Sequence, residues 1–350
     1  MMTTRLIRRL AGMAALAALS LSAACERNPA LSAGDHLAAV VVNSVDNTLS
    51  IVPLEEGGTA RTVGLAQAAS SPVDLAVRGN VAVVPLGVYP FAAVVDLAAG
   101  VVSYRVSLPA NSGATGVAFV NDSVALVANP GRNTVSPVNV RRGQAGAEIA
   151  VGVYPQAIVA GNGATFVINS NLVNFAPAGP GSVTVLNPAL GVQKTIPLSG
   201  VNPAAGAVLG DRLYVLHSGN FGQANGSLSV VNLQTLAEES HHTGFGVFPT
   251  SLEALGNPSV LYVGGFGYGI AAWNPATRQF LVPPATALKP NGIADVGDMT
   301  VDDEGQLFFT APGNCTQPGN LYLVGSSGAI AGQATVGVCP LGVELARIKS

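Results

Sequence analysis

Charged residues are scarce in this sequence. They make up 10% of the 350 residues, whereas 49% are hydrophobic, and this composition excludes an intrinsically disordered chain. The net charge is −3, and removing Arg5, Arg8 and Arg9 with the leader described below takes it to about −6 by subtracting three positive charges. A mildly acidic chain without a basic stripe is poorly suited to phosphate backbones, so no nucleic-acid partner is expected.

Motifs of catalysis are missing as well. The sequence contains no G-x-S-x-G elbow, H-E-x-x-H helix, Walker loop or C-x-x-C-H haem site. It has four histidines and three cysteines, and two cysteines without a nearby histidine do not make a zinc site. No catalytic residue and no metal ligand are therefore assigned, and a non-catalytic protein is favoured over an enzyme.

Glycine and proline are abundant instead, with 42 and 23 residues, and many of the apolar residues are Val, Ala or Leu. That mixture suits many short strands joined by tight turns. Because closed all-β folds often run longer than average as one unit, a single folded domain is expected after the leader.

The first 25 residues resemble a bacterial lipoprotein signal. Three arginines precede an apolar run at 10–21 that is too short to span a bilayer as a mature helix. Small residues and then Cys25 follow, so we expect cleavage just before Cys25 and lipidation of its thiol. Leu21 lies four residues before Cys25, where the usual pattern has it three before, so cleavage near Ala23-Ala24 without lipidation is the alternative. Residues 26–36 read as a polar tether.

A unit of about 40–48 residues repeats seven times after the tether, which is the period of a four-stranded propeller blade. The first clear β runs of the units are AVVVN (Ala39–Asn43), AVVPL (Ala82–Leu86), ALVAN (Ala125–Asn129), TFVIN (Thr165–Asn169), LYVLH (Leu213–His217), LYVGG (Leu261–Gly265) and LFFTA (Leu307–Ala311). A turn and another run follow in most units, as in NTVSPVNV (Asn133–Val140), and the second unit, with FAAVVDL (Phe91–Leu97), is the least regular.

Four units close on the tetrapeptide Gly-Val-X-Pro. It stands at Gly152–Pro155, Gly200–Pro203, Gly246–Pro249 and Gly337–Pro340. The glycine is expected to supply the turn conformation, and the proline fixes φ before the next innermost strand begins.

The two ends of the chain carry the topological clue. The chain enters at the second strand of a unit, Leu37–Asn43, and stops after one spare innermost strand, LGVELARI (Leu341–Ile348). This last strand can complete the first unit and close a ring, which removes exposed sheet edges. The sequence therefore predicts an all-β, seven-bladed β-propeller over residues 37–350, closed by the C-terminal strand. A β-solenoid is the alternative, but its repeats would usually be shorter.

The repeats resemble a known family. The segments NTLSIV, ANPGRNTVSPVNV and GVYPQAIVA, and LYV followed by GSLSVVNLQT, are similar to the YVTN-type repeats of bacterial YncE-like and surface-layer propellers. The usual form there is close to VYVAN-x-x-x-NTVSVID followed by GxxPxGVA, and the resemblance covers roughly residues 36–348. It implies the seven-bladed fold. It implies function only broadly, because such propellers serve as binding modules, scaffolds and, in some relatives, enzyme domains.

Two cysteines remain once Cys25 is lipidated, an even pair for an oxidising compartment. Cys315 lies in the loop between the second and third strands of unit seven, and Cys339 lies in the Gly-Val-Cys-Pro turn that leaves the same unit. Such loops emerge on the same face of a blade, so we expect a Cys315–Cys339 disulfide. Two unpaired buried thiols are the alternative.

Loops expected on one face of the ring, the loop-rich face, carry aromatic side chains that suit a ligand or partner surface. These are Tyr89, Tyr154, Phe175, Phe221, Phe248, Phe266 and Tyr268. His217 ends a strand and opens a long loop on the same face. The candidate binding residues are Tyr89, Tyr154, His217, Phe248 and Tyr268. Burial under neighbouring loops is the alternative for the aromatics, and an ordinary loop position is the alternative for His217.

Acidic residues suggest a different function. Asp74, Glu253 and Glu344 fall just after closing turns on predicted innermost strands, beside the channel. Near the start of unit seven the sequence also contains Asp295, Asp298, Asp302, Asp303 and the tripeptide Pro290-Asn291-Gly292. This tripeptide resembles one of the gluconolactonase-type propellers, whose calcium sites use such an asparagine, and it implies a calcium-dependent hydrolase or lyase. The companion acidic positions do not match in order, and Asp302–Gly305 reads more simply as a hairpin turn.

The favoured function is that of an exported, periplasmic or cell-surface propeller, tethered to a membrane through Cys25, that acts as a non-catalytic binding or scaffold module. Its partner would be an envelope protein or a small ligand at the loop-rich face, and no cofactor is expected. The metal-dependent enzyme, with calcium as its cofactor, is the alternative.

Overall fold

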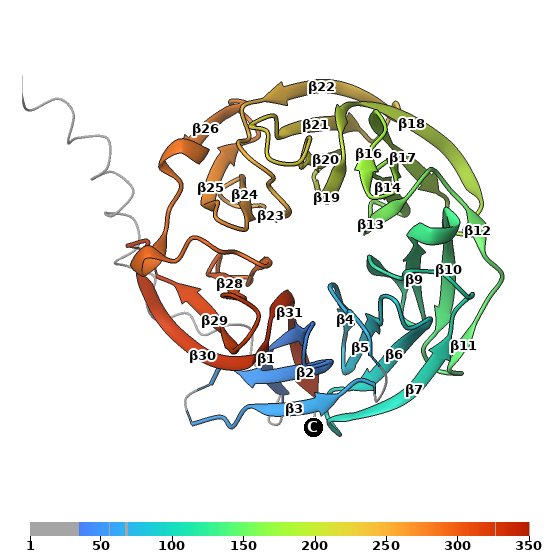
Figure 1. The fold of residues 1–350 in the computed structure, drawn as a ribbon, viewed down its shortest axis with the longest axis vertical. Helices are drawn as coiled ribbons and strands as arrows, with labels where there is room; N and C mark the ends of the chain where they lie inside the picture. The colour runs from blue at the N-terminus through green and yellow to red at the C-terminus, as the bar shows by residue number, and fades with distance from the viewer. Residues whose placement is uncertain (1–34, 56, 67–68, 326, 350) are drawn as a thin grey trace, which may run out of the picture. The chain divides into compact units, whose positions relative to one another are not determined.

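Seven sheets are arranged around a central axis in the computed structural model, which describes residues 35–55, 57–66, 69–325 and 327–349 (Figure 1). Each sheet, or blade, runs from an innermost strand beside the axis to an outermost strand at the rim. Within the part of the chain described, no helix has the length and apolar character needed to cross a membrane. The predicted leader, the tether up to residue 34 and Cys25 lie outside the described residues.

The blades are numbered here in ring order, and their strands are given from the axis outward. Blade 1 contains β31 (Pro340–Lys349), β1 (Asp35–Asn43), β2 (Thr48–Pro53) and β3 (Arg61–Gly64), and blade 2 contains β4 (Ala76–Arg78), β5 (Val81–Pro85), β6 (Phe91–Asp96) and β7 (Val101–Ser107). Blade 3 contains β8 (Val117–Asn121), β9 (Val124–Asn129), β10 (Thr134–Asn139) and two short outer strands, β11 (Gln144–Ala145) and β12 (Ile149–Ala150). Blade 4 contains β13 (Pro155–Gly161), β14 (Ala164–Asn169), β17 (Pro180–Leu186) and β18 (Val192–Val201), with a small hairpin of β15 (Leu172–Val173) and β16 (Ala176–Pro177).

The remaining three blades follow the same order. Blade 5 contains β19 (Pro203–Leu209), β20 (Arg212–His217), β21 (Ser227–Asn232) and β22 (Ala237–Thr243), and blade 6 contains β23 (Ser251–Leu255), β24 (Val260–Gly265), β25 (Gly269–Asn274) and β26 (Gln279–Val282). Blade 7 contains β27 (Met299–Val301), β28 (Leu307–Ala311), β29 (Pro318–Val324) and β30 (Ile330–Val338). Three short 3₁₀ turns, η1 (Pro130–Arg132), η2 (Pro284–Thr286) and η3 (Pro290–Gly292), lie between strands of the described residues.

The two ends of the chain close the ring. β31 pairs with β1 as the innermost strand of blade 1, so the last strand of the sequence completes the first blade. Asn80, in the first hairpin of blade 2, then holds the end of β31, because its side chain bonds both the N–H and the C=O of Lys349 at 2.7 Å. The predicted seven blades and their closure are confirmed.

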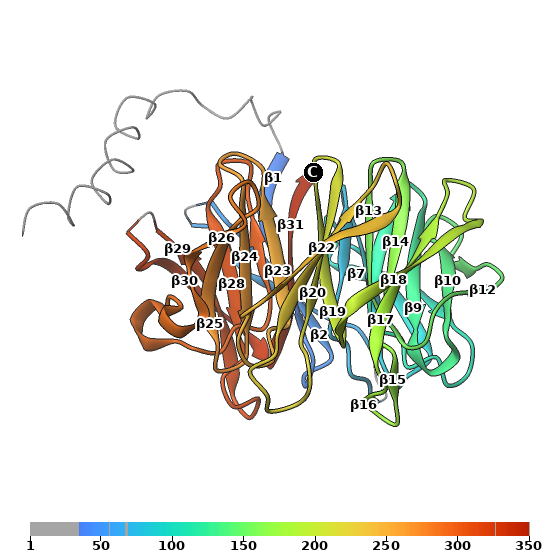
Figure 2. The same cartoon turned by 90° about the horizontal axis from the view of Figure 1, so that it is seen from above.

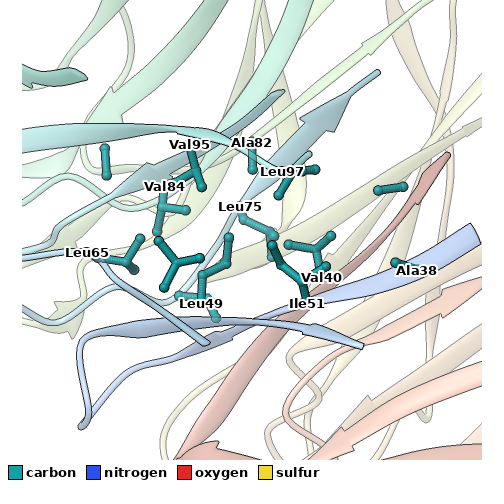
Figure 3. Close-up of a cluster of buried hydrophobic side chains, with 14 of the residues drawn as sticks. Ala38, Val40, Leu49, Ile51, Leu65, Leu75, Ala82, Val84, Val95 and Leu97 are labelled. Carbon is teal, nitrogen blue, oxygen red and sulfur yellow. The ribbon is translucent and has the colours of Figure 1, made fainter. Parts of the chain in front are cut away.

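The core consists of layers between blades. The buried apolar residues of the described chain form seven clusters, and each cluster lies between two neighbouring blades. Figure 3 shows the one between blades 1 and 2, in which Val40, Leu49 and Ile51 face Val84 and Val95. Because both faces of a blade are covered, its middle strands are apolar at successive positions instead of alternating. The runs of Val, Ala and Leu at the start of each repeat have this cause.

A buried polar clasp recurs inside the blades. Asn43 donates from Nδ2 to the hydroxyls of Thr48 and Ser50 at 3.0 and 2.9 Å, across the hairpin of β1 and β2. Asn129 does the same in blade 3 and Asn169 in blade 4, and all three asparagines are fully buried. A buried amide needs such partners, so the asparagine at the end of the second strand and the hydroxyls on the third strand belong together in the repeat.

The closing tetrapeptide works differently from the prediction. The X residue of Gly-Val-X-Pro takes the positive φ in all four copies: Tyr154 (56°), Asn202 (55°), Phe248 (48°) and Cys339 (62°). Gly246 also has a positive φ (80°), as predicted, whereas Gly152 and Gly200 are required by close approach. A Cβ at Gly200 would lie 2.3 Å from the His217 ring, and one at Gly152 would lie 2.6 Å from the Asn169 side chain. The glycine therefore makes room for the clasp residue of the next blade.

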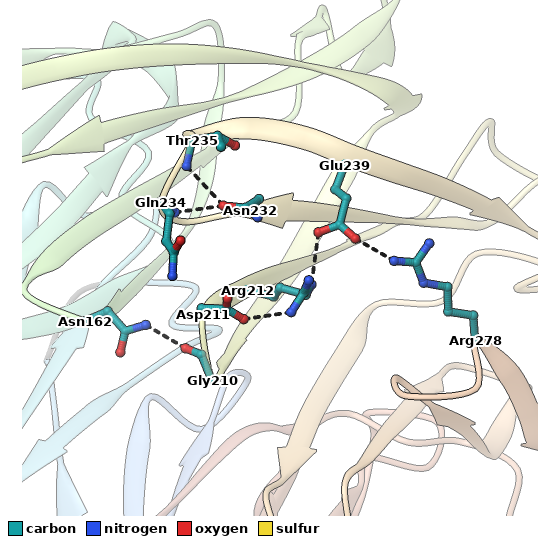
Figure 4. A network of polar contacts seen from close by, with 9 residues as sticks. All are labelled: Asn162, Gly210, Asp211, Arg212, Asn232, Gln234, Thr235, Glu239 and Arg278. Atoms are coloured by element: carbon teal, nitrogen blue, oxygen red, sulfur yellow. Dashed lines mark hydrogen bonds and ion pairs between the residues drawn. The ribbon is translucent and has the colours of Figure 1, made fainter.

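The two faces of the ring carry different connections. On the loop-rich face lie the loops between the second and third strands of each blade, together with the turns that lead from one blade to the next. Short hairpins occupy the opposite face, where β1 begins and β31 ends (Figure 2). Polar contacts there and along the outer rim join neighbouring blades: Glu239 on β22 pairs with Arg212 in the same blade and with Arg278 of blade 6 (Figure 4). These contacts hold blades together without reaching the channel.

Candidate functional site

Four carboxylates face the central channel from four consecutive blades. Glu253 is on β23 of blade 6, Asp298 directly precedes β27 of blade 7, Glu344 is on β31 of blade 1, and Asp74 lies two residues before β4 of blade 2. Blades 3, 4 and 5 contribute no acidic residue to the lining of the channel, where they place residues such as Gly116, Val159 and Ala205. The channel is therefore acidic on one side and uncharged on the other.

Two of these carboxylates also join neighbouring blades. Asp74 accepts hydrogen bonds from its neighbour Leu75 N–H at 2.8 Å and from Val117 N–H of blade 3 at 3.0 Å. Asp298 accepts from Ser251 Oγ of blade 6 at 2.9 Å and from Val343 N–H of blade 1 at 3.1 Å. Each aspartate thus fixes the start of an innermost strand in the next blade, which is a structural role.

The four carboxyl groups have raised pKa values. Burial is the largest cause in each case, because removal from water disfavours the charged form. Together with the charge of Asp298, burial raises the pKa of Asp74 to about 7 and that of Glu253 to about 8, against backbone hydrogen bonds that lower both. Burial raises the pKa of Asp298 to about 6, against the hydrogen bonds it accepts.

The negative charges of the other three carboxylates all act on Glu344. Burial, followed by the charges of Glu253, Asp298 and Asp74, raises its pKa well above the ordinary value. Its side chain is exposed to the water of the channel, and none of the side-chain hydrogen bonds in the described residues involves it. Glu344 is therefore the carboxylate with free capacity to accept a hydrogen bond from a molecule in the channel.

A cavity of about 610 Å³ lies at this place in the channel. All four carboxylates line it, and no Lys, Arg or His of the described chain does. Apolar innermost strands of blades 4 and 5 form the facing wall, and Phe221, Phe248 and Phe266 from the loop-rich face also line the cavity. The volume falls in the range of small-molecule sites, and the unbalanced negative charge favours a cation.

The predicted aromatic residues are only partly at this cavity. Phe248 lines it and packs against Phe221, with ring centroids 5.1 Å apart. Tyr154 is half-buried and meets the exposed Phe175 edge to face, outside the cavity. Tyr89 stacks on Phe91 and packs against the core between blades 1 and 2. Tyr268 is buried and donates from its hydroxyl to Phe245 C=O at 2.7 Å, which places it in the core between blades 5 and 6.

His217 ends a strand, as predicted, but its ring points into the blade. The residue is the last of β20, and its ring is completely buried inside blade 5, with Nε2 2.7 Å from Ser229 Oγ. It occupies the place that Asn43, Asn129 and Asn169 take in their blades, so it is the clasp residue of blade 5. Burial, with a smaller contribution from His241, lowers its pKa to about 3, so the ring is neutral at pH 7.

We expect His217→Asn to fold with a free energy of unfolding within about 1 kcal/mol of the parent, because asparagine is the clasp residue of three other blades. His217→Leu should cost about 1 kcal/mol more, since the buried Ser229 hydroxyl loses this partner and keeps only Glu238. Urea denaturation at pH 7.5 measures both. Equal losses for the two variants would contradict the clasp.

The predicted disulfide is confirmed. Cys315 and Cys339 are bonded, and the bond joins the loop between β28 and β29 to the turn between blades 7 and 1. It lies on the loop-rich face beside the closure of the ring, where Ser44 N–H donates to Cys339 C=O at 2.9 Å. The crosslink therefore stabilises the junction between the first and last blades.

The other acidic residues of unit seven do not join the channel cluster. Asp295 accepts from Gly267 N–H on the loop-rich face, and Asp302 accepts from Glu304 N–H and Gln306 N–H in a hairpin turn, as expected. Asn291 lies exposed in η3. Within the described residues no group of three or more His, Cys, Asp or Glu side chains is arranged to hold a metal ion. The tripeptide and the channel carboxylates are thus separate features.

Comparison with known proteins shows the fold alone. No protein-family model matches the chain, and no curated protein matches it. Among solved structures, the hydrazine synthase of Kuenenia stuttgartiensis is similar, with a TM-score of 0.65 and 13% sequence identity over 84% of this chain and 98% of that chain. At this identity the likeness extends to the propeller architecture and no further.

Proposed function

We propose that this protein is a non-catalytic binding module, and that its ligand is a small cation with an apolar part, held in the central cavity. The observation that carries the proposal is the composition of the cavity wall. Four carboxylates of four adjacent blades face it, and no basic side chain of the described residues balances them. An amine or quaternary ammonium group near Glu344 would supply the missing charge.

The aromatic side chains suit the rest of such a ligand. Phe221 and Phe248 form a pair of rings at the cavity, and Phe266 lines it from the neighbouring blade. Rings of this kind attract cations through their faces and cover apolar groups. Asp74 and Asp298 are engaged with backbone N–H groups, and so is Glu253 with Val301, which leaves Glu344 as the main contact in this proposal.

Export and tethering through Cys25 remain part of the proposal. They are supported by the positively charged and apolar leader, by the position of the cysteine after it, and by the disulfide, which suits an oxidising compartment. A module held at a membrane and open to small molecules at its loop-rich face would report on, store or hand over such a cation without changing it.

Ligand binding provides the test. Isothermal titration calorimetry of the protein from residue 26 onward would use benzylamine, choline and spermidine as cations, benzoate as an anion, and calcium chloride. We expect at least one organic cation to bind and benzoate not to bind. Glu344→Gln should weaken that binding by tenfold or more, since a charge-assisted hydrogen bond contributes about 1.5–3 kcal/mol. Affinity should rise between pH 6 and pH 8, because the carboxylates lose their protons in this range.

The matched control is Asp302→Asn, which removes the same charge from an exposed hairpin on the opposite face. An equal loss of affinity in both variants would mean that only net charge matters and would contradict the proposal. Binding of calcium in preference to every organic cation would favour the metal-dependent alternative instead.

A further inference from the structure

Exposed apolar side chains gather on one face of the propeller. Twelve large apolar side chains of the described residues are exposed, and eight of them lie in the loops and turns of the loop-rich face. The other four, Val101, Tyr104, Val192 and Leu281, are on outermost strands at the rim. Single exposed apolar side chains are normal on a protein surface, whereas a cluster of them marks an interaction site. The concentration of these side chains on one face therefore points to an interaction site there.

Most of the eight form an arc over blades 4 to 6. This aromatic arc consists of Val153, Val173, Phe175, Phe221, Val247 and Phe266. Phe175, at the tip of the β15–β16 hairpin, is 75% exposed. Ring contacts join the arc to half-buried neighbours, from Phe175 to Tyr154 at 6.2 Å and from Phe221 to Phe248 at 5.1 Å.

The arc contains no charge. The connections that make it up, residues 152–154, 170–179, 200–202, 218–226, 244–250 and 266–268, include no Asp, Glu, Lys, Arg or His. Their polar residues are mostly amides and hydroxyls, such as Asn174, Asn220 and Gln223. A surface of this composition complements an uncharged apolar surface and lacks the basic residues that anionic lipid or nucleic acid requires.

Hydrogen bonds also hold the loops of the aromatic arc in place. Ser170 Oγ donates to Pro203 C=O at 2.5 Å, and Ser218 Oγ donates to Pro249 C=O at 2.7 Å, so each loop is tied to the turn that leaves its own blade. Asn171 Nδ2 holds the far side of the hairpin through Pro180 C=O at 3.0 Å. A surface fixed in this way loses little conformational entropy when a partner docks.

The described chain enters the propeller on the face opposite the arc. β1 begins on the opposite face, and blade 1 lies across the ring from blades 4 and 5 (Figure 1). The aromatic arc therefore lies on the face away from the start of β1.

We propose that the aromatic arc is the docking surface for an uncharged, apolar segment of a second protein. This inference goes beyond the cavity and its ligand. Val153, Val173 and Phe175 do not line the cavity, so the docking surface and the ligand site are tested by different residues.

Site-specific photo-crosslinking in intact cells tests the docking surface. A benzoylphenylalanine probe would replace Phe175 in the full chain, and the matched control would carry the probe at Tyr104, an exposed aromatic residue on the rim strand β7. We expect the Phe175 probe to give one discrete adduct with a protein other than this chain, joined through a peptide free of charged residues. The Tyr104 probe should give no such adduct.

A second variant tests whether the adduct depends on the apolar surface around Phe175. Val173→Asp, with the probe still at position 175, should lower the adduct yield at least tenfold, because it places a charge within the apolar contact. Exposed positions tolerate such changes, and an unchanged melting temperature verifies that the variant folds. Adducts with lipid or with a second copy of this chain, equal yields at the two probe positions, or no adduct at position 175 would each overturn the proposal.

Discussion

Raising the pH from 6.5 to 9 is expected to lower the free energy of unfolding of this protein by about 3 kcal/mol in the absence of ligand, because each pKa unit corresponds to 1.36 kcal/mol. The folded-state pKa values of Asp74 and Glu253 are about 7 and about 8, and that of Glu344 is raised well above its ordinary value. In the unfolded chain these groups titrate near pH 4. Between the two ranges the folded state binds more protons, so its stability is full below pH 4 and is lost as the pH rises.

His217 acts in the opposite direction at lower pH. Its folded pKa of about 3 lies below the ordinary value, so the unfolded chain binds its proton first and stability falls as the pH drops below about 6.5. The carboxylates are therefore best measured above pH 6.5, where the histidine is neutral in both states.

Glu344→Gln tests the origin of the effect. This variant removes the group on which the other three charges act, so its free energy of unfolding should fall less between pH 6.5 and pH 9 and exceed that of the parent at pH 9. Asp302→Asn removes a charge from an exposed hairpin and should leave the slope unchanged. Chemical denaturation at four pH values measures both. A parent protein with the same stability at pH 6.5 and pH 9 would refute the carboxylate cluster.

The second large effect concerns the closing strand. A chain truncated after Pro340 should not fold to a stable monomer, because blade 1 would lose its innermost strand and expose the paired edge of β1. Ala346 and Ile348 of β31 lie in the core between blades 1 and 2, and Val343 lies in the core between blades 7 and 1. Removing them opens two of the inter-blade layers at once.

A point variant separates closure from the mere loss of residues. Ala346→Asp places a carboxylate in a position that is 1% exposed, without a partner, and should cost about 3 kcal/mol or more. Lys349→Asp, three residues later on the exposed end of the same strand, should cost less than about 0.5 kcal/mol. Thermal unfolding followed by circular dichroism compares them. A truncated chain that melts at the parent's temperature would show that closure contributes nothing.

The number of blades could be predicted because each repeat carries the same local signals. The runs ending at Asn43, Asn129 and Asn169 are continuous and apolar, and a blade covered on both faces requires this pattern. The spare strand at the C-terminus was equally visible, since an unmatched innermost strand has only one place to pair. The order of the segments along the chain thus predicts the topology of the propeller.

The functional site was harder to predict because it depends on contacts between blades. The alignment of the runs already placed His217 at the position of the buried asparagines, and this signal was sufficient to assign it to the interior. Asp298 follows Val296-Gly297 and has no proline two residues before it, so the repeat pattern did not align it with Asp74. The burial of Tyr268 depends on the Phe245 carbonyl of a separate turn, and no local pattern predicts that contact.

The pairing of β31 with β1 has a consequence for the newly made chain. The ribosome makes β31 about 300 residues after β1, so the first blade stays incomplete until β31 has been made. Until then the growing polypeptide carries an unpaired strand that invites association with other chains. Closure of the ring therefore comes late in folding, when β31 pairs with β1.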